Sequence, residues 1–129
     1  MAKRERPLQT IGSQMSLKYY HLELKLMGCV VCQNAVDTHI HHVLSGSIAK
    51  VGIDKGLALK VSGWLVLPLC ANHHTGRCGI HLIGIEKWEN RFNTQLHYLK
   101  TLNNLFSINV FERAGYSYDS KLDRYYKNH

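Results

Sequence analysis

Apolar residues recur at helical spacing in two stretches of the chain. The first begins after Ser16, a residue type that can cap a helix, and ends at Gly28, which favours a helix C-terminus. The second begins near Glu86 and carries apolar residues three or four positions apart. These are Trp88, Phe92, Leu96, Leu99, Leu102 and Phe106. We expect this second stretch to form one long last helix whose apolar stripe packs in the core.

Two short segments between these helices have the character of strands. Residues 35–43 alternate weakly between apolar and polar and contain β-branched residues, so they predict a strand. Residues 65–69 form a short apolar run that predicts a second strand, and we expect Pro68 to end it. A further helix is expected to start near Cys70 and to stop at the glycines that follow. This order of elements predicts a small α+β fold.

Three segments fall outside the predicted helices and strands. Residues 1–15 are polar and basic and predict a flexible arm. Residues 113–129 form a Tyr-rich, mildly basic C-terminal extension, for which a DNA-contacting tail and a packed segment are both open. Residues 45–63 hold four glycines and are expected to form a long surface loop. The domain itself is therefore placed at residues 16–112.

The composition fits one soluble domain with a polyanionic partner. The chain has 129 residues, of which 45% are hydrophobic and 19% are charged. Sixteen Lys and Arg against nine Asp and Glu give a net charge of +7, which favours nucleic acid ahead of a membrane surface as the partner. No apolar run approaches the about 20 residues of a membrane span. The N-terminus also lacks the apolar segment of a signal peptide, so we expect a cytoplasmic protein.

Evenly spaced lysines in the glycine-rich loop are candidates for phosphate contact. Lys50, Lys55 and Lys60 could each neutralise a phosphate of a nucleic acid, and Arg77 joins this candidate set. The alternative is that these lysines belong to an ordinary solvated loop. Charge alone leaves both interpretations open.

Metal-ligating residue types are concentrated in the middle of the chain. All four cysteines and six of the nine histidines lie between positions 29 and 81. Cys29 and Cys32 are close enough to bind one ion, and Cys70 and His73 can share one face of a helix. Together they predict a Cys₃His site for a structural Zn²⁺ ion. The alternative is a redox Cys-x2-Cys motif with Cys70 buried as a small apolar residue.

The other histidines in this region form a second candidate site. They are His39, His41, His42, His74 and His81. Adjacent helical residues diverge by about 100°, so His74 points away from the zinc site if His73 faces it. His41 and His42 would face opposite sides of a regular strand, so the strand must end or bulge there if both serve one site. Cys78 is treated as a spare thiol.

Paired imidazoles beside a basic loop suit metal-assisted hydrolysis of phosphodiesters. One neutral imidazole can take a proton from water, and others can hold a divalent ion. The alternative is that these are surface or supporting histidines of a purely structural zinc module.

Taken together, these residues resemble the ββα-metal (His-Asn-His, HNH) nuclease motif. The resemblance spans about residues 29–99 and is greatest to a phage and prophage group, the recombination-enhancement (Ref-like, RecA-dependent) nucleases. The residues that carry it are Cys29-Val-Val-Cys32, His41-His42-Val-Leu-Ser-Gly46, Leu67-Pro-Leu-Cys-Ala-Asn-His-His-Thr-Gly76, Gly79-Ile-His81 and residues 88–96. The resemblance implies a zinc-stabilised, treble-clef-like core of hairpin, zinc knuckle and helix, with flanking helices.

The resemblance also implies a role for each matching residue. His42 would be the general base, and His41 and His74 would bind the catalytic divalent ion, which could be Mg²⁺, Mn²⁺, Ni²⁺ or Zn²⁺. His81 would be a further metal or phosphate ligand. The structural Zn²⁺ would be held by Cys29, Cys32, Cys70 and His73. The substrate would be DNA inside a bacterial host, and a RecA-type filament would be a partner.

One position departs from the family pattern. The middle Asn of the motif, or Asp in its near relatives, would fall within Val61-Ser-Gly-Trp-Leu65, which contains neither. That residue usually orients the base and ties the loop, so Ser62 or a backbone carbonyl would have to substitute. Two other functions therefore stay open. A non-catalytic zinc module that binds nucleic acid gains from the missing residue, whereas a thiol oxidoreductase leaves the histidine pairs unexplained.

Overall fold

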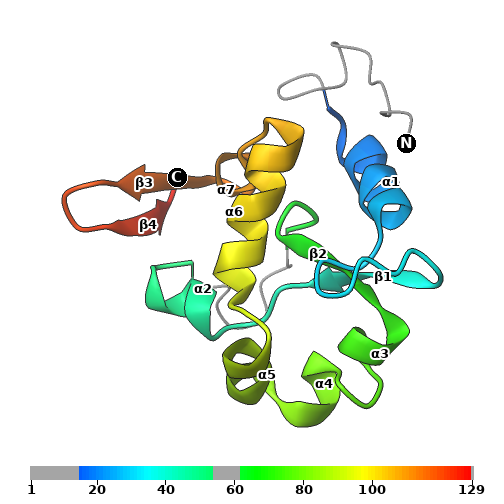
Figure 1. Ribbon diagram of the computed structural model, residues 1–129. Coiled ribbons are helices and arrows are strands. Elements are labelled where there is room, and N and C mark those ends of the chain that lie inside the picture. The colour runs from blue at the N-terminus through cyan, green and yellow to red at the C-terminus, as the bar shows by residue number, and fades with distance from the viewer. Residues whose placement is uncertain (1–14, 54–61, 129) are drawn as a thin grey trace.

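Short α-helices and two small antiparallel sheets make up residues 15–53 and 62–128, the part of the chain that the computed structural model describes (Figure 1). In chain order the elements are α1 (Leu17–Met27), β1 (Thr38–His42), α2 (Ser47–Lys50), β2 (Val66–Cys70), α3 (Ala71–His74), α4 (Ile80–Ile83), α5 (Ile85–Arg91), α6 (Gln95–Phe106), α7 (Val110–Arg113), β3 (Tyr116–Asp119) and β4 (Arg124–Lys127). The predicted α+β class is confirmed. The expected basic arm falls almost wholly outside the described residues, and Met15 at its end is buried.

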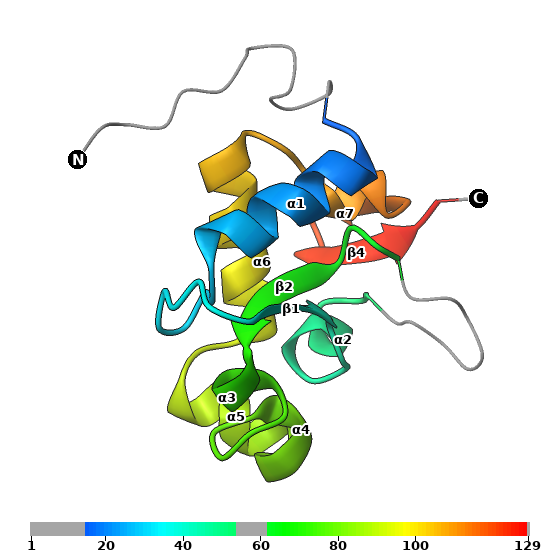
Figure 2. The ribbon, with the colours of Figure 1, turned by 90° about the vertical axis from the view of Figure 1, so that its right-hand side faces the viewer.

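Helix α1 begins and ends where its sequence predicts. The Ser16 side chain accepts a hydrogen bond from the Tyr19 N–H at 3.1 Å, which caps the first turn. Gly28 ends the helix with a φ of 91°, a backbone conformation that favours glycine. The buried face carries Tyr20 and Leu24, and α1 packs with this face against β1 and β2 (Figure 2).

Strands β1 and β2 form an antiparallel hairpin that carries the central part of the chain. His41 pairs with Leu67 and Ile40 pairs with Pro68, so the prediction that Pro68 ends the second strand is wrong. The Pro68 carbonyl accepts a hydrogen bond from the Val30 N–H at 2.9 Å. The nitrogen and carbonyl of one strand residue point to the same side, so the Pro68 nitrogen faces Val30 rather than β1. Proline therefore costs the hairpin no hydrogen bond.

The prediction of a single last helix is also wrong, because the chain breaks between α5 and α6. Thr94 caps the start of α6 by accepting a hydrogen bond from the His97 N–H at 2.9 Å. The Glu89 carboxylate on α5 accepts a second one from the Gln95 N–H at 2.7 Å. These two acceptors stabilise a new helix N-terminus. The apolar spacing continues across the break, so periodicity alone does not reveal it.

The glycine-rich segment after β1 is more ordered than a surface loop. It contains the short helix α2, in which Ile48 is fully buried, and Ile53 beyond it is buried as well. Lys50 is exposed at the end of α2. Lys55 and Lys60 lie outside the described residues. The expectation of a long surface loop is therefore wrong for the first part of this segment.

The C-terminal extension forms the β3–β4 hairpin (Figure 1). The Tyr125 N–H donates to the Val51 carbonyl at 2.7 Å, and the Tyr125 ring lies 4.6 Å from that of Phe111 between centroids. Tyr116 in β3 is buried. This hairpin is thus anchored to both α2 and α7.

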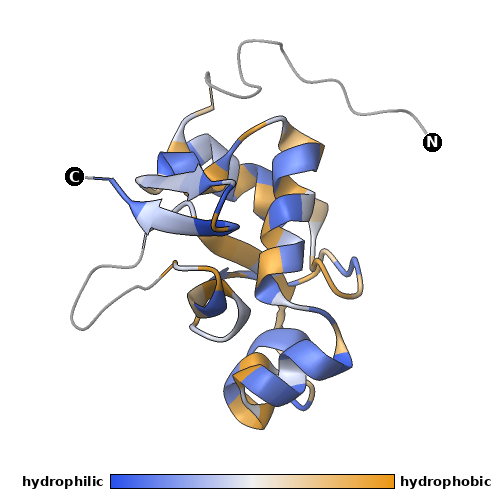
Figure 3. Cartoon of the chain, turned by 90° about the vertical axis from the view of Figure 1, so that its left-hand side faces the viewer, coloured by the Kyte–Doolittle hydropathy of each residue, from blue (hydrophilic) through white to orange (hydrophobic). Residues whose placement is uncertain are grey.

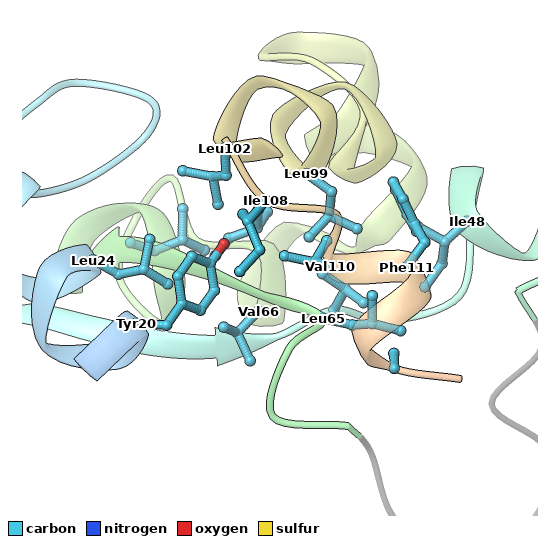
Figure 4. Close-up of a cluster of buried hydrophobic side chains, with 14 of the residues drawn as sticks. Tyr20, Leu24, Ile48, Leu65, Val66, Leu99, Leu102, Ile108, Val110 and Phe111 are labelled. Atoms are coloured by element: carbon cyan, nitrogen blue, oxygen red, sulfur yellow. The ribbon is translucent and has the colours of Figure 1, made fainter. Parts of the chain in front are cut away.

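The hydrophobic core lies between α1, β2, α6 and the segment that leads into α7 (Figure 4). Polar and apolar residues alternate along α6 (Figure 3), and its Leu99, Leu102 and Phe106 are buried in the core. Helices α3, α4 and α5 gather at one end of the molecule, below the β1–β2 hairpin (Figures 1 and 2). None of the helices in the described ranges is long and apolar enough to cross a membrane.

Candidate metal centres

Three cysteines and one histidine meet where the turn after α1 lies beside the start of α3. They are Cys29, Cys32, Cys70 and His73, and their ligand atoms all lie within 4.8 Å of one another. The Cys32 and Cys70 sulfur atoms are 3.7 Å apart. Two thiolates at about 2.3 Å from a tetrahedral ion would be about 3.8 Å apart. The predicted four-ligand cluster is confirmed, and its spacing is right for a metal ion.

Local backbone structure brings the first two cysteines to this cluster. The Cys29 N–H donates to the Asn34 carbonyl at 3.0 Å, and the Gln33 N–H donates back to the Cys29 carbonyl at 2.8 Å. This tight turn follows Gly28, where a Cβ would lie 2.9 Å from the Asn34 oxygen. The Val30 N–H then ties the turn to β2 through the Pro68 carbonyl. The turn that carries Cys29 and Cys32 is therefore attached to β2, the strand that supplies Cys70.

The second pair of ligands follows from the junction of β2 and α3. Cys70 ends β2 and is the N-cap residue of α3, as predicted, and His73 lies one turn later. The His73 Nδ1 atom is 3.2 Å from the Cys70 sulfur and 3.8 Å from that of Cys29. Burial, followed by the nearby Arg91 charge, lowers the pKa of His73, which favours the neutral imidazole that a metal ligand needs.

Burial raises the pKa of the Cys29 thiol, although hydrogen bonds from neighbouring groups oppose this shift. A thiol that is buried among other thiols resists ionisation unless a cation compensates the charge. The chemistry of this donor set therefore fits a bound cation. Cys78 does not belong to the cluster.

A second cluster forms from three histidines on three different elements. His41 comes from β1, His74 from α3 and His81 from α4, and one nitrogen of each lies within 4.8 Å of the others. The His74 and His81 Nε2 atoms are 3.1 Å apart. The ring of His41 lies 5.1 Å from that of His74 and 5.4 Å from that of His81, between centroids. The two adjacent histidines of α3 thus reach different clusters.

Hydrogen-bonded partners surround this histidine cluster. The Nδ1 atoms of His39 and His74 are 2.9 Å apart, and His39 Nε2 lies 3.3 Å from the Asp37 carboxylate. If the carboxylate accepts from His39 Nε2–H, His39 Nδ1 accepts from His74 Nδ1–H. The His74 Nε2 lone pair then faces the cluster. Burial, followed by the neighbouring His81 and His39, lowers the pKa of His74 and favours its neutral form.

His42 does not join the three clustered histidines. It is the last residue of β1, pairs with Val66 in regular register and is exposed, whereas His41 is buried. Successive residues of a strand face opposite sides, so the His42 ring leaves the sheet on the side away from His41.

Arg77 is exposed in the turn between α3 and α4. The Ser62 hydroxyl accepts a hydrogen bond from the Trp64 N–H at 3.1 Å.

Gly79 sets the distance between the two helices that carry His74 and His81. A Cβ at Gly79 would lie 2.6 Å from the His74 carbonyl carbon and 2.8 Å from the Gly76 nitrogen, both backbone atoms that cannot rotate away. We expect Gly79→Ala to push α4 from α3, to lower the free energy of unfolding by about 1–3 kcal/mol, and to weaken ion binding at the histidine cluster. Urea unfolding and Co²⁺ titration measure the two effects.

Gly84→Ala is the matched comparison for this prediction. Nothing lies within 4 Å of a Cβ at Gly84, but its φ of 95° disfavours any other residue. This variant should lose about 1–3 kcal/mol and keep wild-type affinity for Co²⁺. Equal Co²⁺ affinities for the two variants would contradict the spacing role of Gly79.

Comparison with protein-family models, with curated proteins and with solved structures finds no match for this chain. What the two clusters can do therefore follows from their donor sets. Four ligands that include three thiols are typical of closed structural metal sites. Three imidazoles leave a coordination position open for water or substrate, which is typical of catalytic sites.

Proposed function

We propose that this chain is a metal-dependent endonuclease of the ββα-metal (HNH) type that hydrolyses phosphodiester bonds of DNA. The observation that carries the proposal is the convergence of His41, His74 and His81 beside a separate four-ligand cluster. Strands β1 and β2 pair antiparallel, with α2 in the connection between them, and β2 runs directly into α3, so the paired strands are followed by a helix as in a ββα motif. The net charge of +7 supports a nucleic acid as the substrate.

The two clusters would then divide the work between them. The first, formed by Cys29, Cys32, Cys70 and His73, would hold a structural Zn²⁺ ion. The second, formed by His41, His74 and His81, would hold a divalent ion such as Mg²⁺, Mn²⁺, Ni²⁺ or Zn²⁺. When bound, this ion offsets the negative charge on the scissile phosphate and on the leaving oxygen. Burial lowers the pKa of His74 and so favours the neutral form that such a ligand needs.

His42 is our candidate for the general base. Its exposure at the end of β1 allows water and DNA to reach the imidazole. Because the ring leaves the sheet on the side opposite His41, this role requires the end of β1 to turn His42 toward the histidine cluster when DNA binds. In its neutral form this ring can take the proton from the attacking water while the new P–O bond forms. The P–O bond to the leaving oxygen then breaks, and that oxygen is protonated from solvent. Lys50 and Arg77, both exposed, are candidates for contacts to flanking phosphates.

A cleavage assay with supercoiled plasmid and D-loop DNA tests the proposed function. We expect the wild-type chain to nick DNA with at least one of Mg²⁺, Mn²⁺, Ni²⁺ and Zn²⁺. Replacing the proposed base in His42→Ala should slow cleavage by about 10²- to 10³-fold. Bound metal and melting temperature should stay as in the wild type, because His42 lies outside both clusters.

The assay also includes a RecA filament, since the sequence resembles RecA-dependent phage nucleases. Salt-sensitive DNA binding without cleavage, with every ion and with or without the filament, would contradict the nuclease and support the non-catalytic zinc module. Retained cleavage by His42→Ala would contradict only the assignment of the base.

A further inference from the structure

Gln95 is a fully buried polar residue that links α6 to the histidine-bearing strand. Its Oε1 atom lies 2.9 Å from the Leu44 backbone nitrogen and 3.1 Å from His41 Nε2. Its Nε2 atom lies 2.9 Å from the Leu44 carbonyl and 3.1 Å from that of Ser45. All four hydrogen-bonding positions of the amide are therefore used, which is typical of a buried polar group with a defined role.

These backbone partners leave the Gln95 amide with one possible orientation. The Leu44 N–H can only donate, so the amide atom that faces it must be the oxygen. The carbonyls of Leu44 and Ser45 can only accept, so the amide nitrogen must face them. The same oxygen faces His41, and His41 Nε2 must therefore carry a hydrogen and donate it. The unprotonated nitrogen of His41, the one that can bind a metal ion, is then Nδ1.

We propose that Gln95 is a positioning residue of the histidine cluster. It holds the His41 ring in the tautomer that has its lone pair on Nδ1, the atom that would bind an ion in the cluster, and it fixes residues 44–45 just beyond His42. This inference rests on the proposed function, because it assigns a metal ligand's partner. A partner that orients a ligating histidine normally strengthens metal binding by one to two orders of magnitude.

The backbone of Gln95 is itself held in place by α5 and α2. The Glu89 carboxylate accepts hydrogen bonds from the Gln95 N–H at 2.7 Å and from the Ser47 hydroxyl at 2.6 Å. The Ser47 hydroxyl also accepts from the Leu96 N–H at 3.1 Å. The Gln95 side chain therefore projects toward His41 from a support that has little freedom to move. This is the arrangement that a preorganised ligand requires.

Two substitutions of Gln95 distinguish its effect on the orientation of His41 from its effect on the backbone of residues 44–45. Gln95→Met keeps the approximate size of the side chain but cannot accept from His41 or tie residues 44–45. Gln95→Glu still accepts from His41 and from the Leu44 N–H, but it cannot donate to the two carbonyls. Both variants should be less stable than the wild type in urea. Only Gln95→Met should lose the orientation of His41.

The experiment measures ion affinity at the histidine cluster, without reference to catalysis. The full chain is loaded with one equivalent of Zn²⁺, and Co²⁺ is titrated by visible absorption. Absence of thiolate-to-cobalt charge transfer verifies that Zn²⁺ stays in the cysteine cluster. We expect Gln95→Met to weaken Co²⁺ binding by about 10- to 100-fold. Gln95→Glu should bind Co²⁺ with nearly wild-type affinity.

Asn103→Leu is the matched control on the same helix. The Asn103 side chain accepts a hydrogen bond from the Val110 N–H at 2.9 Å, away from the histidines. This variant should lose stability and keep wild-type Co²⁺ affinity. Wild-type affinity in Gln95→Met, or equal losses in Gln95→Met and Gln95→Glu, would overturn the inference.

The same titration separates this inference from the proposed function. A wild-type chain that binds no second ion would contradict both. A second ion bound normally, weakened by Gln95→Met, but without any DNA cleavage would contradict the nuclease and support the positioning role.

Discussion

Replacing Cys29 by serine is expected to lower the free energy of unfolding by about 4 kcal/mol or more. Cys29 is fully buried, and it is one of four ligands in the cysteine cluster. Binding of a structural zinc ion contributes on the order of 10 kcal/mol to the folding of small zinc domains. Without this thiolate the proposed ion is held by three ligands, and a hydroxyl replaces a sulfur in an apolar position. Urea unfolding and measurement of zinc per chain test the expectation.

Cys78 provides the matched control for this prediction. It is partly exposed and lies outside the cluster, so Cys78→Ser should change stability by no more than about 0.5 kcal/mol. It should also retain the wild-type zinc content. Equal stabilities of the two serine variants would show that the cysteine cluster does not hold a structural ion.

Replacing His74 by alanine is expected to reduce DNA cleavage by about 10⁴-fold. The His74 ring joins the cluster to its neighbour His39: its Nε2 lies 3.1 Å from that of His81, and its Nδ1 lies 2.9 Å from that of His39. Without it only His41 and His81 remain to hold the proposed catalytic ion. The fold should persist, because the cysteine cluster uses His73 instead. Cleavage rates, zinc content and melting temperature are measured on the same preparation.

His97→Ala is the control for loss of a histidine. His97 is exposed on α6 and belongs to neither cluster. This variant should cleave DNA at the wild-type rate. Wild-type cleavage by His74→Ala would rule out a catalytic role for the histidine cluster, whereas loss of the structural zinc in that variant would contradict the division of labour between His73 and His74.

Elements with strong local signals were predictable from the sequence. Helix α1 has a capping serine, an apolar face and a terminal glycine, and it forms as these signals predict. Trp88, Leu99, Leu102 and Phe106 of the last helical region are buried as expected, and Phe92 and Leu96 pack partly buried against them, although the region divides in two. The break at Thr94 depends on Glu89, which belongs to the preceding helix and reaches the new N-terminus only after the chain turns. Such a contact does not change the spacing of apolar residues, so the sequence pattern does not reveal it.

The position of Pro68 illustrates the same limit. Proline is excluded from strands only where its nitrogen faces a partner strand, and the sequence cannot say which side is paired. In the structure the Pro68 nitrogen faces the turn at Val30 and not β1, so β2 continues through Pro68. Helix α2 was missed for a related reason, since its burial depends on contacts with α6 rather than on its own short apolar pattern.

The cysteine cluster could be predicted because each half of it is local. Two ligands lie on one turn and two on one helical turn, so short-range geometry brings each pair together wherever the domain folds. The different directions of His73 and His74 follow from helical geometry in the same way. Which histidines His74 would meet depends on how β1, α3 and α4 pack. Gln95, more than fifty positions from His41, received no role because a single buried glutamine has no sequence signature. Local stereochemistry thus settled the paired ligands, whereas the histidine cluster and its glutamine partner depend on long-range packing, which short spacings do not encode.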